Sequence, residues 1–202
     1  DEAIAKVMGA IESRGWGNDL DVLYTTDHGE FQGDFGLLFK GPYHVDSLMR
    51  LPLIWRPAPS ANIAPARVSA PVGHVSLAAT FAHIAGMAQP SYVEAPRLPI
   101  HQAEAEQLGH ERVLTEWDSV LFGKIVHLRT ICRDNWVCTA ALDGTMSKAG
   151  EGELYDLTHD PLQHVNRWDD PSVRTLREDL LADMWDNLPS QHLPLRSMDA
   201  PV

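Results

Sequence analysis

The stretch VLYTTDHGEFQGDFGLLFKG, residues 22–41, decides how this chain folds. It continues the run DVLYTT (21–26), whose β-branched and aromatic residues predict a short strand. The run is so apolar that we expect cover on both faces of the strand, as in a parallel sheet. The strand stops at Asp27-His28-Gly29, and Lys40 follows in front of Gly41-Pro42. An acid, an imidazole and an amine therefore gather beyond the end of a predicted buried strand.

The segments around this strand predict an α/β fold for the first part of the chain. Apolar residues at helical spacing predict a helix over residues 3–14, and helix, loop and strand together form half of a β-α-β unit. A turn followed by a second helix is predicted over 70–87, and the Pro- and Glu-rich stretch 88–110 is interpreted as a connection. The candidates for parallel strands are 21–26, 50–57 and 112–117.

The pattern changes near residue 120. KIVHLRTICR (124–133), NWVCTAAL (135–142) and GELYDL (152–157) predict short strands of a meander, joined by Asp-Asn and Asp-Gly turns. A helix follows, with Asp170 as its cap and Pro171 at its first position. We therefore divide the chain into an α/β core over 1–118 and a small α+β subdomain over 119–202, with a loosely held tail from Pro189.

Composition narrows the function classes. Lys and Arg number 16 and Asp and Glu 28, so the net charge is −12, which argues against nucleic-acid binding. No apolar run is long enough to predict a membrane span. Cys132 and Cys138 are too few for a zinc site, and their spacing suggests one face of a single strand, where we expect them as small apolar core residues. The chain begins at Asp1 rather than Met, and we therefore expect a longer parent chain. The sequence does not predict the cellular compartment of the protein.

Asp27 and His28 stand where an open α/β sheet binds its ligands, outside the carboxyl end of a strand. A carboxylate and a neutral imidazole both bind divalent cations, and Gly29 permits the backbone turn that would aim both at one ion. Lys40 could hold an anion. The alternative is a plain Asp-Gly turn with a solvated lysine, and the residues alone leave both interpretations open.

Longer motifs resemble one known family. TTDHGEFQGDFGLLFKGPYHVDSLMRLPLIW (25–55) resembles the sulfatase segment DHGE…GDHGL…KG…Y…S…R[VI]PLI. APVGHVSLAATFAHIAGMAQP (70–90) is similar to V…HVDLAPTLLDLAGV…P, and VLTEW (113–117) to VF[ST]E. The segment 127–173 resembles RT…KY…ELYDL..DP.E..NL..DP. The resemblance covers roughly residues 1–188 and implies the C-terminal part of an alkaline-phosphatase-like α/β sandwich with a small antiparallel-sheet plus helix subdomain.

The resemblance also implies roles for four residues. Asp27 and His28 match metal ligands, and Lys40 matches the catalytic lysine that contacts sulfate or phosphoryl oxygens. His44 could line the substrate pocket, or it could be a surface or packing histidine. The implied cofactor is a divalent metal, with Ca2+ in first place and Mg2+ or Mn2+ as alternatives. His74 and His83 are expected to be packing residues.

The chain departs from the family pattern in two ways. Phe35 replaces the histidine of GDHGL, which puts a polar substrate contact from this position in doubt. No C/S-x-P-x-R motif, whose Cys or Ser becomes the formylglycine nucleophile in the family, occurs in the sequence. The other metal ligands would also lie upstream. We therefore expect a C-terminal portion that is stable only with an N-terminal segment, with a second copy, or after repacking.

The implied function of the parent is metal-dependent hydrolysis of a small anionic sulfate ester through a covalently sulfated formylglycine. The alternatives are phosphonate or phosphate ester hydrolysis on the same scaffold, which His28 keeps open, and a non-catalytic fragment. This chain alone is expected to be inactive because the nucleophile motif is absent. The sequence does not identify the substrate.

Overall fold

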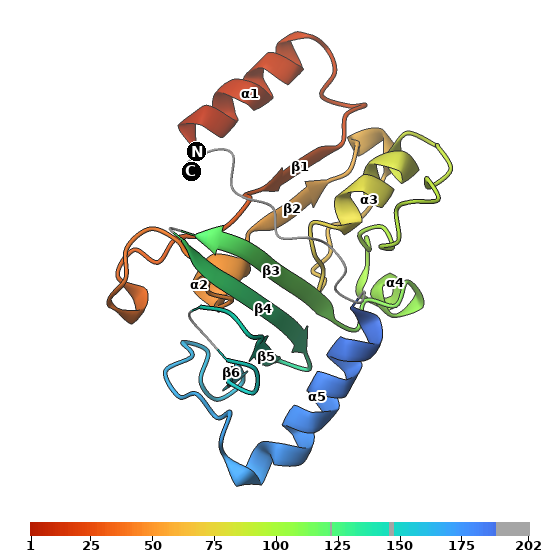
Figure 1. The fold of residues 1–202 in the computed structure, drawn as a ribbon. Helices are drawn as coiled ribbons and strands as arrows, with labels where there is room; N and C mark the ends of the chain where they lie inside the picture. Colours follow the sequence, from red (N-terminus) through yellow and green to blue (C-terminus); the bar gives the residue numbers. More distant parts are fainter. Residues whose placement is uncertain (122, 146–147, 189–202) are drawn as a thin grey trace.

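The computed structural model describes residues 1–121, 123–145 and 148–188, and the predicted tail from Pro189 lies outside this part. Two sheets organise the molecule. A two-stranded sheet joins β1 (Val22–Thr25) and β2 (Leu53–Arg56), and a four-stranded sheet follows in the second part of the chain (Figure 1). The predicted strands 21–26 and 50–57 are therefore confirmed as strands.

Helices precede and follow β1 and β2 along the first part of the chain. The predicted helices over 3–14 and 70–87 are confirmed as α1 (Glu2–Ser13) and α3 (Ser76–Ile84). The short helix α2 (Asp46–Met49) precedes β2, and two 3-10 turns, η1 (Asp34–Gly36) and η2 (Pro59–Ala61), lie in the loops.

The interpretation of 88–110 as a plain connection is wrong, because it contains α4 (Gln102–Gln107). The segment QAEAEQ consists of good helix formers. Glu104 secures it by accepting a hydrogen bond from the Ile100 amide at 2.6 Å and by pairing with Arg97.

The expected parallel arrangement is wrong. β1 and β2 pair antiparallel, with Val22 opposite Arg56 and Thr25 opposite Leu53. Cover on both faces is also wrong for the described residues, because Tyr24 is 43% exposed and Ile54 is 62% exposed. Residue type predicts that a strand forms, but the direction of its neighbour depends on long-range contacts.

The four-stranded sheet is the predicted meander, with one strand more than expected. Its order is β3 (Val113–Leu121), β4 (Lys124–Arg133), β5 (Trp136–Ala141), β6 (Gly152–Asp156), and each neighbouring pair is antiparallel. The run 112–117 therefore lies in the four-stranded sheet. We expected it beside β1 and β2, and that expectation is wrong. β3 continues past residue 118, and the division of the chain there stays a prediction.

The main core lies between this sheet and α5 (Arg174–Asn187), which follows the 3-10 turn η3 (Pro171–Val173). The Asp170 side chain accepts from the Ser172 amide at 2.8 Å, which confirms the predicted cap. Fully buried residues of β4, β5, β6 and α5 make up this core: Ile131, Cys138, Leu154, Leu180 and Met184.

The two cysteines lie on different strands, because a turn at Asp134-Asn135 separates β4 from β5. The one-strand interpretation of Cys132 and Cys138 is thus wrong. Both thiols are free, Cys138 is a core residue as predicted, and Cys132 is partly buried.

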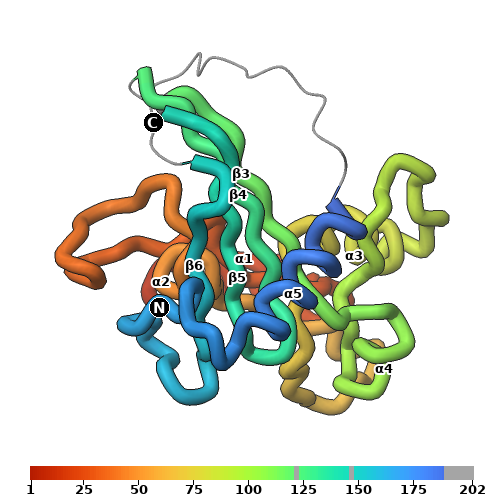
Figure 2. Tube along the Cα trace, turned by 60° about the horizontal axis from the view of Figure 1, so that its bottom comes forward, coloured from red at the N-terminus to blue at the C-terminus, as the bar shows by residue number. Residues whose placement is uncertain are grey.

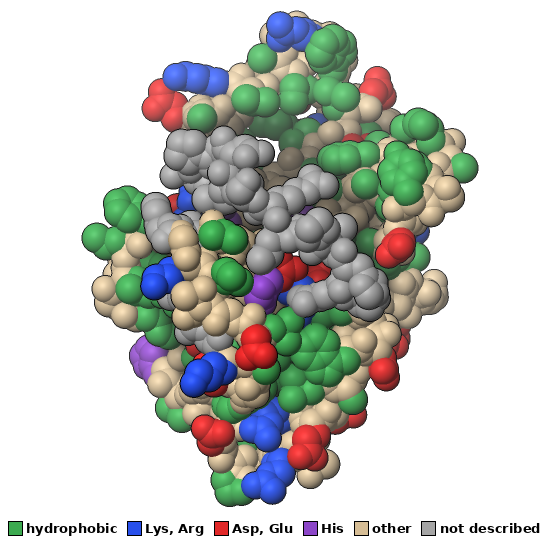
Figure 3. Space-filling view, viewed as in Figure 1, with side chains coloured by type: hydrophobic (Ala, Val, Ile, Leu, Met, Phe, Trp, Pro, Cys, Tyr) green, Lys and Arg blue, Asp and Glu red, His purple; other side chains and the backbone are tan. Residues whose placement is uncertain are grey.

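α1 stands apart from this core. None of its residues is buried, and Ile4 and Val7 are 44% and 59% exposed. Figure 2 shows α5 beside the strands of the four-stranded sheet, with α2 close to the sheet. Hydrophobic side chains lie on the surface of α1 and around α3 in Figure 3. No helix of the described residues is long and apolar enough to cross a membrane.

Candidate functional site

The candidate metal ligands lie directly beyond the end of β1. The Asp27 side chain is 83% exposed and the His28 side chain 36% exposed, so both reach solvent. His28 Nε2 lies 3.5 Å from Asp27 Oδ2, which brings the two predicted ligand atoms together. Asp27 Oδ1 accepts from the His28 amide at 3.0 Å and from the Thr26 hydroxyl at 3.2 Å. The backbone hydrogen bonds lower the pKa of Asp27, so its carboxylate is ionised at neutral pH.

The His28 ring is oriented by its own backbone. Nδ1 lies 2.8 Å from the Gly29 carbonyl oxygen, which can only accept, so Nδ1 carries the hydrogen. In the neutral ring this leaves the lone pair on Nε2, the atom that faces Asp27. Metal-binding histidines are held in this way, with the second nitrogen donating to a carbonyl or carboxylate.

These two side chains fit part of a divalent-cation site. A separation of 3.5 Å between donor atoms is about that of two neighbouring ligands with bonds of about 2.1–2.5 Å to one ion. Within residues 1–121, 123–145 and 148–188, however, no three His, Cys, Asp or Glu side chains are grouped to hold a metal. The described residues therefore supply two ligands, and a complete coordination shell needs others.

Lys40 follows the loop 31–39, whose ends are joined by a 2.8 Å hydrogen bond from the Phe31 amide to the Phe39 carbonyl. This bond returns the chain to the neighbourhood of His28, because Phe31 is three residues beyond that histidine. Lys40 is exposed, and it forms no ion pair with the described residues. Lys40 is thus an exposed residue at the base of this loop, and its place in the site stays a prediction.

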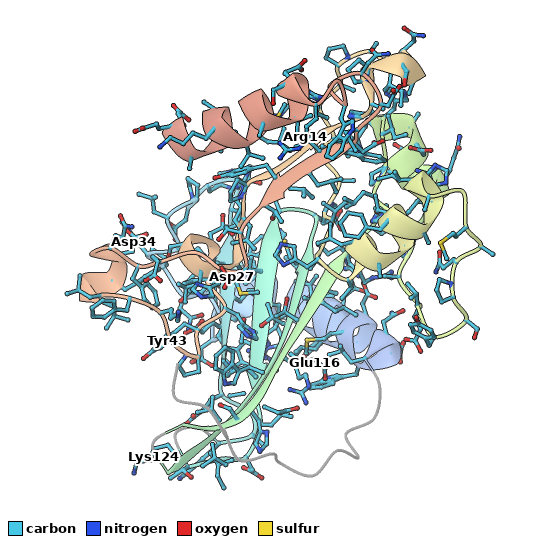
Figure 4. The ribbon with its side chains drawn as sticks, turned by 90° about the horizontal axis from the view of Figure 1, so that it is seen from above. Arg14, Asp27, Asp34, Tyr43, Glu116 and Lys124 are labelled. Carbon is cyan, nitrogen blue, oxygen red and sulfur yellow. The ribbon has the colours of Figure 1, made fainter. Side chains whose placement is uncertain are left out.

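The loop itself is apolar and tightly wound. Phe35 has a φ of 55°, in the left-handed region that glycine usually occupies, and Gly33 and Gly36 on either side also have positive φ. The Phe35 ring is 47% exposed and makes an edge contact with the buried Phe31 ring at 6.1 Å. At the position of the family's histidine, the loop therefore presents an aromatic surface. Asp34 lies farther out on η1, away from Asp27 (Figure 4).

His44 lies inside the protein. Its ring is 2% exposed, Nδ1 is 2.7 Å from Thr130 Oγ1 on β4, and the ring meets Trp117 edge-on. Burial, together with the positive charge of Arg129, lowers the pKa of His44 to about 4. The contact with substrate predicted for His44 stays a prediction, and its burial in the described residues gives it no support.

The prediction that His74 and His83 are packing residues is wrong, because both are exposed. His74 lies beside the candidate site. Its Nε2 lies 3.0 Å from Thr25 Oγ1, on the last residue of β1. Spacing along the predicted helix could not reveal this contact, because His74 precedes α3 and meets a strand 49 residues earlier in the chain.

Comparison with known proteins places this geometry in context. No protein-family model matches the chain. The uncharacterized sulfatase YidJ of Escherichia coli (strain K12) is 29% identical over 192 residues, which are 93% of this chain and 36% of YidJ. The predicted resemblance to a sulfatase is thereby confirmed.

Solved structures share the fold. The phosphonate monoester hydrolase of Agrobacterium radiobacter superposes with a TM-score of 0.76 at 19% identity, covering 90% of this chain and 37% of that chain. BT4656, determined in complex with its substrate D-glucosamine-2-N,6-O-disulfate, gives 0.73 at 21% identity, covering 92% and 37%. The expected fold class is confirmed, and the chain spans little more than a third of the length of these relatives, in their C-terminal part.

Proposed function

We propose that this chain is the part of a metal-dependent sulfate ester hydrolase that supplies two metal ligands, Asp27 and His28, and one anion-binding residue, Lys40. The observation that carries this proposal is the orientation of the His28 ring, whose Nε2 faces the Asp27 carboxylate at 3.5 Å while Nδ1 is held by Gly29. The similarity to YidJ over 93% of the chain supports the assignment.

Each residue has a distinct task in this site. Asp27 brings a fixed negative charge, and His28 brings a neutral nitrogen donor in a preset orientation. A bound divalent metal, Ca2+ in first place with Mg2+ or Mn2+ as alternatives, would polarise an oxygen of the ester. The amine of Lys40, an exposed residue at the base of the loop 31–39, would hold the anionic substrate and stabilise charge on the leaving oxygen.

The site requires groups that this chain does not contain. The sequence has no C/S-x-P-x-R nucleophile motif, and the described residues offer two metal ligands. We infer that a further segment, or a second copy of the chain, supplies the nucleophile and the remaining ligands. The match to only 36% of YidJ favours a further segment. The 202-residue chain alone would then show no turnover.

A phosphonate monoester is the second candidate substrate. The phosphonate monoester hydrolase gives a TM-score of 0.76, and His28 stands at a position where that branch of the family is expected to have histidine. The two ester classes have similar shape and are both monoanions at neutral pH, so fold alone does not separate them.

The test is hydrolysis of 4-nitrophenyl sulfate and of a phenyl phosphonate 4-nitrophenyl ester by the purified protein, with and without EDTA. A denaturing intact-mass spectrum of the same sample shows whether a second chain carrying formylglycine is present. We expect EDTA-sensitive turnover with the sulfate ester only where that nucleophile is present. Turnover that EDTA leaves unchanged would contradict a metal-dependent hydrolase, and exclusive turnover of the phosphonate would select the second candidate.

A further inference from the structure

We propose that Gln163, a buried residue of the second part of the chain, is a positioning residue for His28. It would act through α2, the short helix that touches the candidate site on one side and Gln163 on the other. The inference rests on the proposed function for the role of His28 as a metal ligand, whereas the contacts themselves do not depend on it.

α2 holds the backbone that orients His28. The Gly29 amide donates to the Leu48 carbonyl at 2.8 Å, and the Gly29 carbonyl accepts from His28 Nδ1 at 2.8 Å. The backbone of α2 approaches Gly29 so closely that a Cβ atom on Gly29 would lie 1.9 Å from the Ser47 carbonyl oxygen. Any displacement of α2 would therefore move the Gly29 peptide, and with it the ring of His28.

Gln163 fixes the opposite end of α2. Its Oε1 accepts from the Asp46 amide, at the first residue of the helix, at 2.6 Å. The Gln163 side chain is 2% exposed, and within the described residues its Nε2 has no hydrogen-bond partner. The hydrogen bond to Asp46 therefore satisfies the acceptor of the buried Gln163 side-chain amide.

The backbone around Gln163 is preset for this contact. Gln163 has a φ of 56°, which an L residue adopts at a cost, and its amide donates to the Asp160 carbonyl at 3.0 Å. The Asp160 carboxylate in turn accepts from the Val165 amide at 2.8 Å. A turn held in this conformation gives Gln163 little freedom to follow a moving helix.

A second anchor lies two residues before α2. His44 Nδ1 bonds Thr130 Oγ1 at 2.7 Å, and Thr130 Oγ1 is 2.8 Å from Thr139 Oγ1. The segment between Lys40 and β2 is therefore tied at two points to the second part of the chain. Its other packing is a small cluster of Phe31, Val45 and Leu48.

The sequence offers a matched rescue variant. Gln163 stands at the E of the motif DP.E..N that residues 160–166 resemble. Gln163→Glu keeps an acceptor oxygen at the same distance from the backbone, whereas Gln163→Met keeps the length and removes the acceptor. The exposed neighbour Leu162, 67% accessible, provides the control Leu162→Ala.

The experiment uses the purified 202-residue chain without metal. Hydrogen exchange of the Gly29 amide and the 15N shifts of the His28 ring, which report its tautomer, are measured in each variant. We expect Gln163→Met to speed Gly29 exchange at least tenfold and to mix the His28 tautomers. Gln163→Glu and Leu162→Ala should retain the wild-type values. Unchanged exchange and tautomer in a folded Gln163→Met would overturn the proposal.

Two further measurements keep the result interpretable. If circular dichroism shows that Gln163→Met is unfolded, Gln163→Asn, whose amide is one methylene too short to reach Asp46, is tested in the same way. Mn2+ titration of the whole protein, which would hold the remaining ligands, should give a Kd about tenfold weaker for Gln163→Met than for Leu162→Ala. A whole protein that binds no Mn2+ would count against the proposed function, and Gly29 exchange would still decide the role of Gln163.

Discussion

Substitution of Asp27 tests metal binding without a large effect on stability, because its carboxylate is exposed and contributes little to packing. We expect Asp27→Ala to abolish the metal-dependent turnover of the whole protein and to weaken Mn2+ binding by at least tenfold. The melting temperature of the metal-free protein should change little. Asp34→Ala, an acid on the neighbouring loop, is the control and should behave as wild type. Retained metal-dependent turnover in Asp27→Ala would contradict the ligand assignment.

Lys40 tests the anion site. Its side chain is exposed, so its removal should leave the free energy of unfolding within about 0.5 kcal/mol of the wild type. If Lys40 stabilises charge in the transition state, Lys40→Ala should lower kcat about 100- to 1000-fold with a smaller effect on KM. Lys6→Ala, on the exposed helix α1, is the control. A lower melting temperature with an unaltered kcat would instead make Lys40 a structural residue.

His44 predicts a pH dependence of stability. Its pKa is about 4 in the folded chain and ordinarily about 6.5, so between these values the unfolded chain binds a proton that the folded chain does not. The free energy of unfolding therefore falls on acidification through this window, by at most about 1.4 kcal/mol per pH unit, and His44 adds nothing above it. Urea unfolding at pH 7 and 4.5 should show a smaller loss for His44→Asn than for wild type or for the exposed His83→Asn. Equal losses would contradict the prediction.

At the scale of elements, a Gly29→Ala substitution tests how closely α2 packs against the segment that follows β1. A Cβ on Gly29 would clash with the Ser47 carbonyl, so Gly29→Ala should destabilise the chain by about 1–3 kcal/mol. Gly9 lies inside α1, where a Cβ would meet no atom within 4 Å, and Gly9→Ala should stabilise the helix by about 0.5–1 kcal/mol. Thermal unfolding of both variants checks the pair. Equal shifts in one direction would contradict the described contact.

Sequence reasoning predicted most elements but not their partners. The strands 21–26 and 50–57, the helix 3–14 and the meander all follow from residue type and spacing, which are local properties. The antiparallel pairing of β1 with β2 and the inclusion of 112–117 in the second sheet depend on contacts between distant segments. The helix α4 was missed because its six residues are too few to show a hydrophobic period.

In the candidate site, too, local features could be predicted from the sequence, whereas contacts between distant residues could not. Asp27 and His28 are adjacent in sequence, and their proximity to a strand end could be predicted from the motif. The contact of His44 with Thr130 and that of Gln163 with Asp46 join residues 86 and 117 positions apart, and single-sequence patterns carry no sign of either. The residues that orient a site are therefore harder to predict than the residues that make it up.

At the scale of the whole molecule, the exposed apolar residues of α1 can be used to test whether this helix is covered in a larger protein. Ile4 and Val7 are exposed, and a two-stranded sheet such as β1–β2 is too small to be stable without further cover. We expect Val7→Asp to change the free energy of unfolding of the 202-residue chain by less than about 0.5 kcal/mol. In the whole protein the same change should cost about 2 kcal/mol or more, because it would bury a charge against the completing segment.

Urea unfolding of the chain and of the whole protein, each with Val7→Asp and with the control Lys6→Gln on the same helix, measures this difference. Lys6 pairs with Glu2 on the exposed side of α1, so its substitution should have little effect in either form. A large effect of Val7→Asp in the whole protein alone would identify α1 as an internal helix of the complete protein. Equal, small effects in both forms would show that α1 stays on the surface.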